Sequence, residues 1–384
     1  MKVAVLGYGT VGAGVYSMLS DAPGMEAGPV LVRPGKAVES FMVSDAALIF
    51  GDPTVDAVVE TLGGLDPAYS YGMRALEAGK HFITANKAMV ASHGLELAAL
   101  ARETGAAFLF SAACGGGVPF LHNLALSAET DRIEAVSGIL NGTTNYMLDA
   151  MQRRSLSYGD ALREAQSLGY AESDPTADVS GLDALRKMQL ACAVAFGVLP
   201  QSGMLCEGME HFTAADVEDI QSRGLVCRLM ARGSRAGESV SAYVEPALFP
   251  RAAPESSVFT NNNMARYTGK RCGSIALMGQ GAGRFPTASA VLRDLSAAQQ
   301  GARSMFPENC RAAEADNREA VHSYYIRTGG FAAVRLPLRS VLAQGEVVRA
   351  VTEPMSAEKM HALAQNIRKD GNDLFFAALE EELC

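Results

Sequence analysis

The chain has 384 residues, of which 48% are hydrophobic and 20% charged, so it can build on the order of two or three globular domains with substantial cores. Its net charge of −9 and scattered basic residues argue against a nucleic-acid or membrane-surface partner, and no apolar run reaches the roughly 18 residues of a membrane span. Seven irregularly spaced cysteines and a start without a signal-peptide pattern predict free thiols and a cytoplasmic location.

Residues 1–111 are predicted to alternate short strands with helices. The expected strands are 3–6, 30–32, 57–61, 82–84 and 107–110, and the expected helices are 12–19, 67–78 and 95–103. This alternation implies right-handed crossovers and a parallel, doubly wound sheet of the Rossmann type, so we expect an α/β fold.

From about Pro119 the elements become longer and mixed. Helices are expected near 145–154, 160–168 and 178–196, strands at 133–140 and 240–244, a polar loop at 250–263, a strand, turn and helix from 274 to 300, and a linker at 299–318. The end of the chain predicts a small α+β unit in the order strand, helix, strand, helix, strand. We therefore expect a dinucleotide-binding domain at 1–118 completed by about 279–300, a mixed α/β domain at 119–278, and a linker plus C-terminal unit at 301–384.

A glycine-rich turn follows the first predicted strand and opens the first helix. In this turn Gly7 permits the tight bend, Gly9 lets the backbone approach a pyrophosphate, and Gly12 allows close helix–sheet packing. Together with Thr10 and Val11, these glycines form a candidate dinucleotide site at a helix N-terminus. A tight turn without a ligand is the alternative.

The end of the second predicted strand carries basic residues and no acid. An acid there would bind the ribose hydroxyls of NAD, whereas Arg33 and Lys36 could receive the 2′-phosphate of NADP. This favours NADP over NAD, unless Arg33 is only a solvated surface residue.

Asp183 and Lys187 lie four residues apart on the predicted 178–196 helix, with the acid in the favourable N-terminal position. An exposed pair of this kind contributes little. However, the following run 188–196 is apolar apart from Gln189, which predicts a buried helix. We expect burial to lower the pKa of Lys187, and we expect the nearby Asp183 to restore that pKa in part. Such a lysine could donate or accept a proton beside a carbonyl.

Several stretches together resemble the homoserine dehydrogenase family over roughly residues 1–300. They read VAVLGYGTVGAGV, VVETLGG, GKHFITANKAMVASHG, GGGVP, GILNGTTNYM, EAQSLGYAESDPTADVSGLDALRKM and GQGAGRFPTASAV. The resemblance implies an enzyme of threonine and methionine biosynthesis that interconverts L-homoserine and L-aspartate 4-semialdehyde with NAD or NADP. It also implies a small amino-acid substrate, a substrate domain that dimerises the chain, and an ACT-like regulatory unit at the C-terminus.

The resemblance also implies roles for particular residues. Lys187 matches the proton-transfer lysine and Asp183 the acid that orients it, while Lys87 is a second acid/base candidate. Glu172 and Asp178 match acids that hold the substrate ammonium group. The pocket wall matches Tyr170, Gly142 and Thr143, and positions near the cofactor match Gly63, Gly64, Thr84, Gly281 and Gly283.

Two features depart from the family pattern. Ser111 stands where many members have a glutamate that helps to hold a monovalent cation, which leaves the backbone carbonyls around Cys114 and Gly116 as candidate ligands of Na⁺ or K⁺. Residues 328–330 (Thr-Gly-Gly) replace the Asp-x-Pro-Gly turn of an ACT module. The C-terminal unit is then either a shortened ACT-like module that has lost threonine binding or an unrelated oligomerisation tail.

Two rival functions remain open at this point. Cys114 on its glycine-rich loop, with His122 as base, could be the nucleophile of an acylating aldehyde dehydrogenase. Alternatively, the chain could be an inactive, nucleotide-sensing relative.

Overall fold

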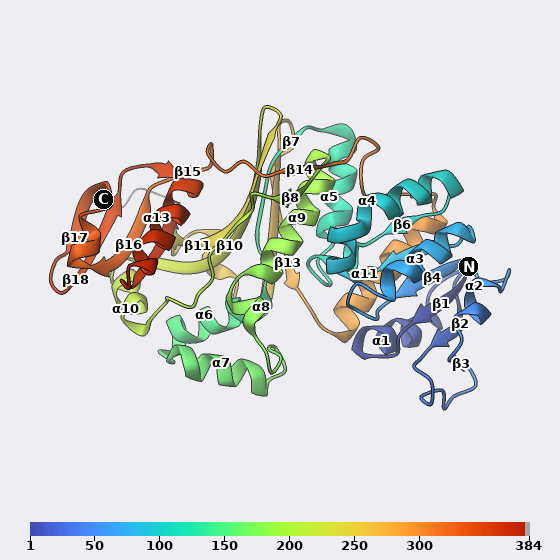
Figure 1. Ribbon diagram of the computed structural model, residues 1–384. Helices are drawn as coiled ribbons and strands as arrows, with labels where there is room; N and C mark the ends of the chain where they lie inside the picture. Colours follow the sequence, from blue (N-terminus) through green and yellow to red (C-terminus); the bar gives the residue numbers. More distant parts are fainter. Residues whose placement is uncertain (381–384) are drawn as a thin grey trace.

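The computed structural model describes residues 1–380 and arranges them along one long axis, with the N-terminal sheet at one end and the C-terminal strands at the other (Figure 1). The N-terminal sheet is parallel throughout and has the order β3-β2-β1-β4-β5-β6. Its strands are β1 (Lys2–Leu6), β2 (Glu26–Leu31), β3 (Met42–Val43), β4 (Ala57–Glu60), β5 (His81–Thr84) and β6 (Phe108–Leu109). The strand order reverses between β1 and β4, so a ligand crevice is expected at the carboxyl ends of these two strands. The predicted doubly wound sheet is confirmed.

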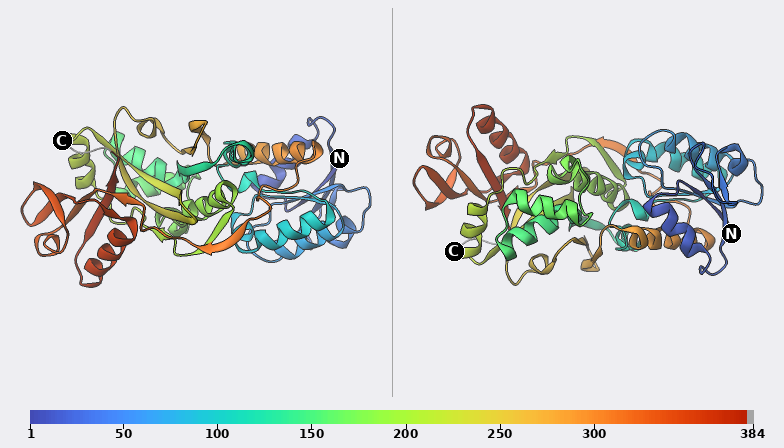
Figure 2. Two further views of the ribbon diagram at one scale, coloured as in Figure 1. Left: turned by 90° about the horizontal axis from the view of Figure 1, so that it is seen from above. Right: turned by 90° about the horizontal axis from the view of Figure 1, so that it is seen from below.

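Helices cover both faces of this sheet. They are α1 (Thr10–Leu19), α2 (Ala47–Phe50), α3 (Ala68–Glu77), α4 (Lys87–Thr104) and α11 (Arg284–Gln299). Figure 2 shows α1 and α11 (blue and orange) on one face and α3 and α4 on the other. Gly14 of α1 lets α11 approach, because a Cβ there would lie 2.9 Å from Arg284. Helix α4 begins eight residues earlier than predicted, since the Asn86 side chain accepts the Met89 N–H and caps it.

A second, mixed sheet runs through the rest of the molecule in the order β13-β12-β7-β10-β11-β20-β16-β18-β17, with β9 (Leu205–Cys206) beside β11. Its strands are β7 (Ile133–Ile139), β10 (Leu225–Ala236), β11 (Ser239–Pro250), β12 (Asn262–Gly269), β13 (Gly273–Gln280), β16 (Tyr324–Gly329), β17 (Leu338–Ala343), β18 (Val347–Thr352) and β20 (Leu374–Leu379). The sequence predicted none of β10, β12 and β17, and the predicted loop at 250–263 overlaps only the first two residues of β12. Parallel pairing of β20 with β11 joins the C-terminal strands to the middle of the molecule.

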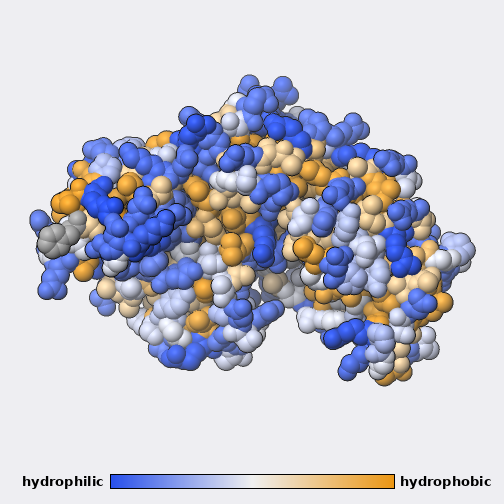
Figure 3. Space-filling view, viewed as in Figure 1, coloured by the Kyte–Doolittle hydropathy of each residue, from blue (hydrophilic) through white to orange (hydrophobic). Residues whose placement is uncertain are grey.

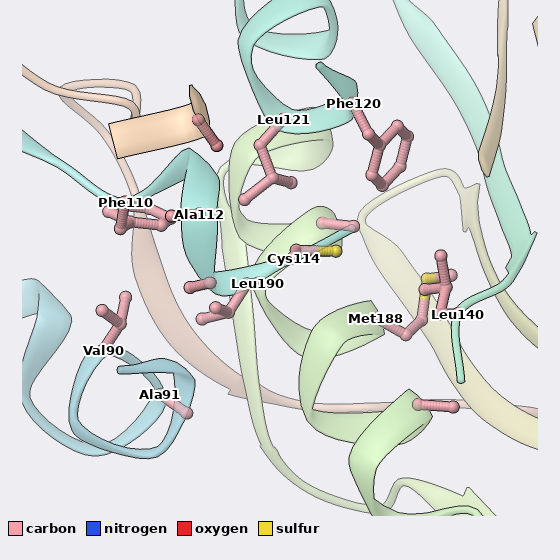
Figure 4. Packing of buried hydrophobic residues seen from close by; sticks show 14 of the residues in the cluster. Val90, Ala91, Phe110, Ala112, Cys114, Phe120, Leu121, Leu140, Met188 and Leu190 are labelled. Carbon is pink, nitrogen blue, oxygen red and sulfur yellow. The ribbon is translucent and has the colours of Figure 1, made fainter. Parts of the chain in front are cut away.

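The middle of the chain supplies most of the remaining helices: α5 (Phe120–Thr130), α6 (Gly142–Arg154), α7 (Tyr158–Ser167), α8 (Thr176–Val179), α9 (Leu182–Phe196) and α10 (Ala214–Ser222). The predicted helix over 178–196 is wrong at its start. Gly181 has a φ of 82° and separates α8 from α9, because a left-handed residue cannot continue a helix. On α9, Met188 and Leu190 pack with Cys114, Phe120 and Leu121 in the largest hydrophobic core (Figure 4).

The predicted linker at 299–318 is also wrong in part, because β14 (Arg311–Glu314) pairs in parallel with β8 (Val198–Ser202). The C-terminal part has the predicted order of β16, α12 (Gly330–Ala333), β18, α13 (Ala357–Lys369) and β20, with β17 as an additional strand. The short strands β15 (Val321–His322) and β19 (Met355–Ser356) pair with each other, and the 3-10 turns are η1 (Ser111–Ala113) and η2 (Pro254–Ser257). Among residues 1–380, no helix has the length and apolar character that crossing a membrane requires.

Candidate active site

A cavity of about 1110 Å³ lies at the carboxyl ends of β1, β2 and β4, where the strand order reverses. Gly7, Gly9 and Gly63 line it. Gly7 has a φ of 98°, and a Cβ on Gly12 would lie 2.1 Å from the Gly7 carbonyl oxygen, so neither position tolerates a larger residue. A Cβ on Gly9 would meet no atom within 4 Å, which leaves the backbone open to a phosphate. Thr10 is the exposed first residue of α1.

The far wall of this cavity belongs to the loop after β2. Arg33 and Lys36, the residues predicted to receive a 2′-phosphate, line the cavity, and both are exposed. Glu39, which sequence reasoning missed, lines it as well, because the acid stands in the loop and not directly after the strand. Tyr8 lies against Phe41, with ring centroids 5.7 Å apart, and forms an aromatic edge of the same cavity.

Glu60, at the end of β4, organises the loop beside the glycine turn. It is fully buried, and its Oε1 accepts hydrogen bonds from the backbone N–H of Leu62 at 2.6 Å and of Gly63 at 3.1 Å. Its Oε2 accepts the hydroxyl of Thr84 at 2.6 Å. Thr84, a predicted cofactor-binding residue, is itself buried, and its hydroxyl donates to Glu60. The sequence offered no signal for Glu60 beyond an acid at the end of an apolar strand.

A second cavity, of about 600 Å³, lies between the N-terminal part and the middle of the molecule, where Figure 3 shows the surface indented. Val11, Gly116, Gly281 and Gly283 line its side toward the glycine turn. The cavity brings together all the predicted acid/base and substrate residues: Lys87, Gly142, Thr143, Tyr170, Glu172, Asp178, Asp183 and Lys187. Asn141, Asp174, Arg186 and Asn261 also line it and were not predicted.

Asp183 lies at the centre of the charged residues in this cavity. Its Oδ2 is 2.6 Å from Lys187 Nζ and its Oδ1 is 3.0 Å from Lys87 Nζ, so one carboxylate bridges both lysines. Lys187 Nζ also donates to the carbonyl oxygen of Leu140 at 2.6 Å. The Lys187 side chain is 11% exposed and that of Lys87 35%, so Lys87 is the more accessible amine.

Burial of Lys187 lowers its pKa, and this is the largest single effect, but the charge and hydrogen bond of Asp183, with smaller contributions from Cys114 and Asp178, outweigh it. The pKa of Lys187 is therefore raised above its ordinary value, and the expectation of a lowered pKa is wrong. Burial would raise the pKa of Asp183, yet Lys187 and Lys87 hold it well below the ordinary value. Burial raises the pKa of Asp178. The cavity thus contains an ammonium–carboxylate pair that stays ionised near neutral pH.

The N-terminus of α6 also lines the second cavity, through Gly142 and Thr143. A Cβ on Gly142 would lie 2.8 Å from the Asn261 carbonyl oxygen, so this position needs glycine. The Thr143 hydroxyl donates to the Tyr170 carbonyl oxygen at 2.6 Å and ties α6 to the loop that carries Tyr170 and Glu172. Both of these loop residues are exposed at the mouth of the cavity.

Cys114 lies in the core, and its surroundings do not favour nucleophilic catalysis. It is fully buried, and burial raises the pKa of its thiol to about 12, so little thiolate forms near neutral pH (Figure 4). Beside it, Ser111 N–H donates to Asp294 Oδ2 at 2.8 Å. Six cysteines are free; Cys384 lies outside the described residues. Within residues 1–380, no group of three His, Cys, Asp or Glu side chains is arranged to hold a metal ion.

Comparisons with known proteins agree with this geometry. The family model described as homoserine dehydrogenase matches residues 119–296, and the one described as homoserine dehydrogenase, NAD binding domain, matches residues 7–111. The chain belongs to the homoserine dehydrogenase family. It is accordingly an oxidoreductase acting on a CH–OH group, and the acylating and non-enzymatic alternatives are not favoured.

Individual homoserine dehydrogenases resemble this member of the family over most of their length. The Corynebacterium glutamicum enzyme is 38% identical over 76% of this chain and 70% of its own, and the Synechocystis enzyme is 37% identical over 77% and 72%. The crystal structure of a homoserine dehydrogenase from Thiobacillus denitrificans superimposes with a TM-score of 0.88 at 29% identity, covering 99% of this chain and 98% of the other.

Proposed function

We propose that this member of the homoserine dehydrogenase family interconverts L-homoserine and L-aspartate 4-semialdehyde in amino-acid biosynthesis, within the second cavity. The observation that carries the proposal is the Asp183 carboxylate bridging Lys87 and Lys187 in a cavity that adjoins the glycine turn. The test is the change in nicotinamide absorbance with L-homoserine, and with the semialdehyde in reverse. Absence of turnover in both directions would overturn it.

The proton-transfer step belongs to the two lysines. A nicotinamide coenzyme bound at the glycine turn would supply the hydride acceptor or donor for the carbinol carbon. An ammonium group has three N–H donors; Lys187 uses two of them, on Asp183 and on Leu140, and keeps one for the substrate oxygen. Its raised pKa keeps the amine protonated near neutral pH, so a proton is present beside the substrate oxygen during reduction of the aldehyde. Among residues 1–380, Lys87 forms an ion pair with Asp183 alone, and it is the second candidate at the same oxygen.

An amino-acid substrate brings an ammonium and a carboxylate into the cavity. We assign Glu172 and Asp178 to the ammonium group, because both acids line the cavity and Lys87 and Lys187 are already paired with Asp183. Helix α6 begins at Gly142, and its first N–H groups, with the positive end of the helix dipole, suit the carboxylate.

We infer a preference for NADP over NAD. Arg33 and Lys36 line the cofactor cavity on the side where the second strand ends, and they match the charge of a 2′-phosphate. Glu39 on the same loop would favour ribose hydroxyls and opposes this preference. The measurement is kcat/KM for NADP⁺ against NAD⁺, and a ratio below one would reverse the assignment.

We further propose that the chain is a homodimer with the domain division 1–118 completed by 279–300, 119–278 and 301–384. Strand β13 forms one edge of the long sheet and Met278 on it is 62% exposed, which supports a partner at this edge. Light scattering of the purified chain tests the dimer.

Two further features stay predictions. One is a weak Na⁺ or K⁺ site at the carbonyls of Cys114 and Gly116, which turnover with added KCl tests. The other is an ACT-like C-terminal unit without threonine binding, which turnover with added threonine tests.

A further inference from the structure

Asn141 is the N-cap residue of α6 and lines the second cavity, the proposed substrate cavity. Its Nδ2 donates to Asp178 Oδ1 at 2.7 Å and to Asp183 Oδ2 at 2.9 Å. Its Oδ1 accepts from the Thr144 backbone N–H at 2.8 Å and from the Thr144 hydroxyl at 3.0 Å. One side-chain amide therefore connects α8, α9 and the N-terminus of α6.

The hydrogen-bonding capacity of this amide is fully used within the protein. The two N–H groups have two carboxylate acceptors, and the oxygen has two donors. A backbone N–H can only donate, so the oxygen of Asn141 must face Thr144 and the nitrogen must face the acids. The residue is 4% exposed. Asn141 has no group left for a substrate, although it lines the cavity.

The arrangement addresses an electrostatic problem of the site. Asp178 and Asp183 both accept from one nitrogen, so two carboxylates lie close together in a place where burial disfavours charge. Lys187 and Lys87 compensate Asp183, but Asp178 has no ion-pair partner among the described residues. The amide is a neutral donor to both acids. It therefore favours the ionised carboxylate of each acid without adding a cation that would compete with the lysines for Asp183.

We propose that Asn141 is a positioning residue that holds the ammonium-binding Asp178 and the lysine-orienting Asp183 in register with the carboxylate-binding end of α6. The inference rests on the proposed roles of these acids. It predicts that loss of the Asn141 side-chain NH₂ group lowers homoserine turnover, whereas the side-chain oxygen only caps α6.

Two substitutions separate the role of the Asn141 side-chain NH₂ group from that of its oxygen. Asn141→Asp keeps an acceptor for Thr144 but turns an oxygen toward the two acids. Asn141→Ser keeps a smaller cap and removes the two amide N–H groups that bind Asp178 and Asp183. A matched control is Asn366→Asp, which makes the same change at an exposed position on α13. The readouts are homoserine kcat/KM as a function of pH, the Kd of NADPH by fluorescence, and the thermal midpoint.

For Asn141→Ser we expect homoserine kcat/KM to fall about 10- to 100-fold, with the Kd of NADPH within about twofold of the parent. For Asn141→Asp we expect a larger fall. The acid limb of its profile should also move to higher pH by about one unit, because repulsion raises the pKa of the neighbouring acids. The new carboxylate would contact Asp178 on α8 and Asp183 on α9, and the nearby cations are Lys187 on α9 and Lys87 on α4, which are both paired with Asp183.

Two results would overturn the inference. One is a parental pH profile and kcat/KM in both variants. The other is an equal loss of NADPH binding and thermal stability in both, which would make Asn141 a residue of the fold alone. A parent chain that does not turn over homoserine would instead refute the proposed function, and that assay is run first.

Discussion

Asp183→Asn is the most informative perturbation of the site, because it removes the one charge that two lysines share without changing the shape of the side chain. At 2.6 Å, Coulomb's law with an effective dielectric constant of 20 gives an attraction of about 6 kcal/mol between Asp183 and Lys187. That figure omits the dehydration of both ions, and breaking a buried pair typically lowers stability by about 3–5 kcal/mol. We adopt the lower range for the expected loss in the free energy of unfolding.

The loss should depend on pH in a defined direction. The folded pKa of Asp183 is lowered, so its contribution is present above the unfolded value of about 4 and disappears as pH falls through the folded pKa. The folded pKa of Lys187 is raised, so its contribution is present below the unfolded value of about 10.4 and disappears as pH rises through the folded pKa. Parent and variant should therefore differ most between about pH 5 and 9.

Urea unfolding followed by far-ultraviolet circular dichroism measures this difference, and steady-state kinetics on the same samples reports the loss of homoserine turnover. The matched control is Asp370→Asn, which breaks an exposed ion pair with Arg335 and should lower stability by no more than about 1 kcal/mol. If Asp183→Asn were no more destabilising than this control and kept parental turnover, the bridging role of Asp183 would be refuted.

Three further outcomes are expected. Lys187→Ala should lower kcat by roughly 10²- to 10⁴-fold with the Kd of NADPH unchanged, and a larger loss in Lys87→Ala would assign proton transfer to Lys87 instead. Arg33→Ala should lower kcat/KM for NADP⁺ about tenfold or more while that for NAD⁺ holds; equal losses would indicate a general loss of cofactor binding. Burial raises the pKa of Asp294 to about 7, so parental stability should fall as pH rises from about 4 to 7. Asp294→Asn should abolish that fall and raise the thermal midpoint at pH 8, and an unchanged pH dependence by calorimetry would contradict the assigned burial effect.

Local signals in the sequence determined much of this protein. The glycine turn, the alternating apolar strands and helices, and the four-residue spacing of Asp183 and Lys187 depend only on residues close together in the chain. Each of these features recurs in the structure. The residues that the family resemblance named for acid/base and substrate roles all line the second cavity, but the resemblance did not name Asn141, Asp174, Arg186 or Asn261, which line it as well. Local patterns failed where small or polar residues conceal regular structure, as in β10, which contains Arg-Gly-Ser-Arg, and at Gly181, which ends an apparently continuous helix.

Only the tertiary structure decided which charges meet. Lys87 reaches Asp183 across nearly a hundred residues, Asn141 meets two acids from different helices, and Glu39 enters the cofactor cavity from a loop. The direction of the Lys187 pKa shift was settled in the same way, because burial and the ion pair oppose each other and their balance depends on distances between packed elements. Periodicity describes which face of an element is buried, whereas electrostatics depends on what packs against that face.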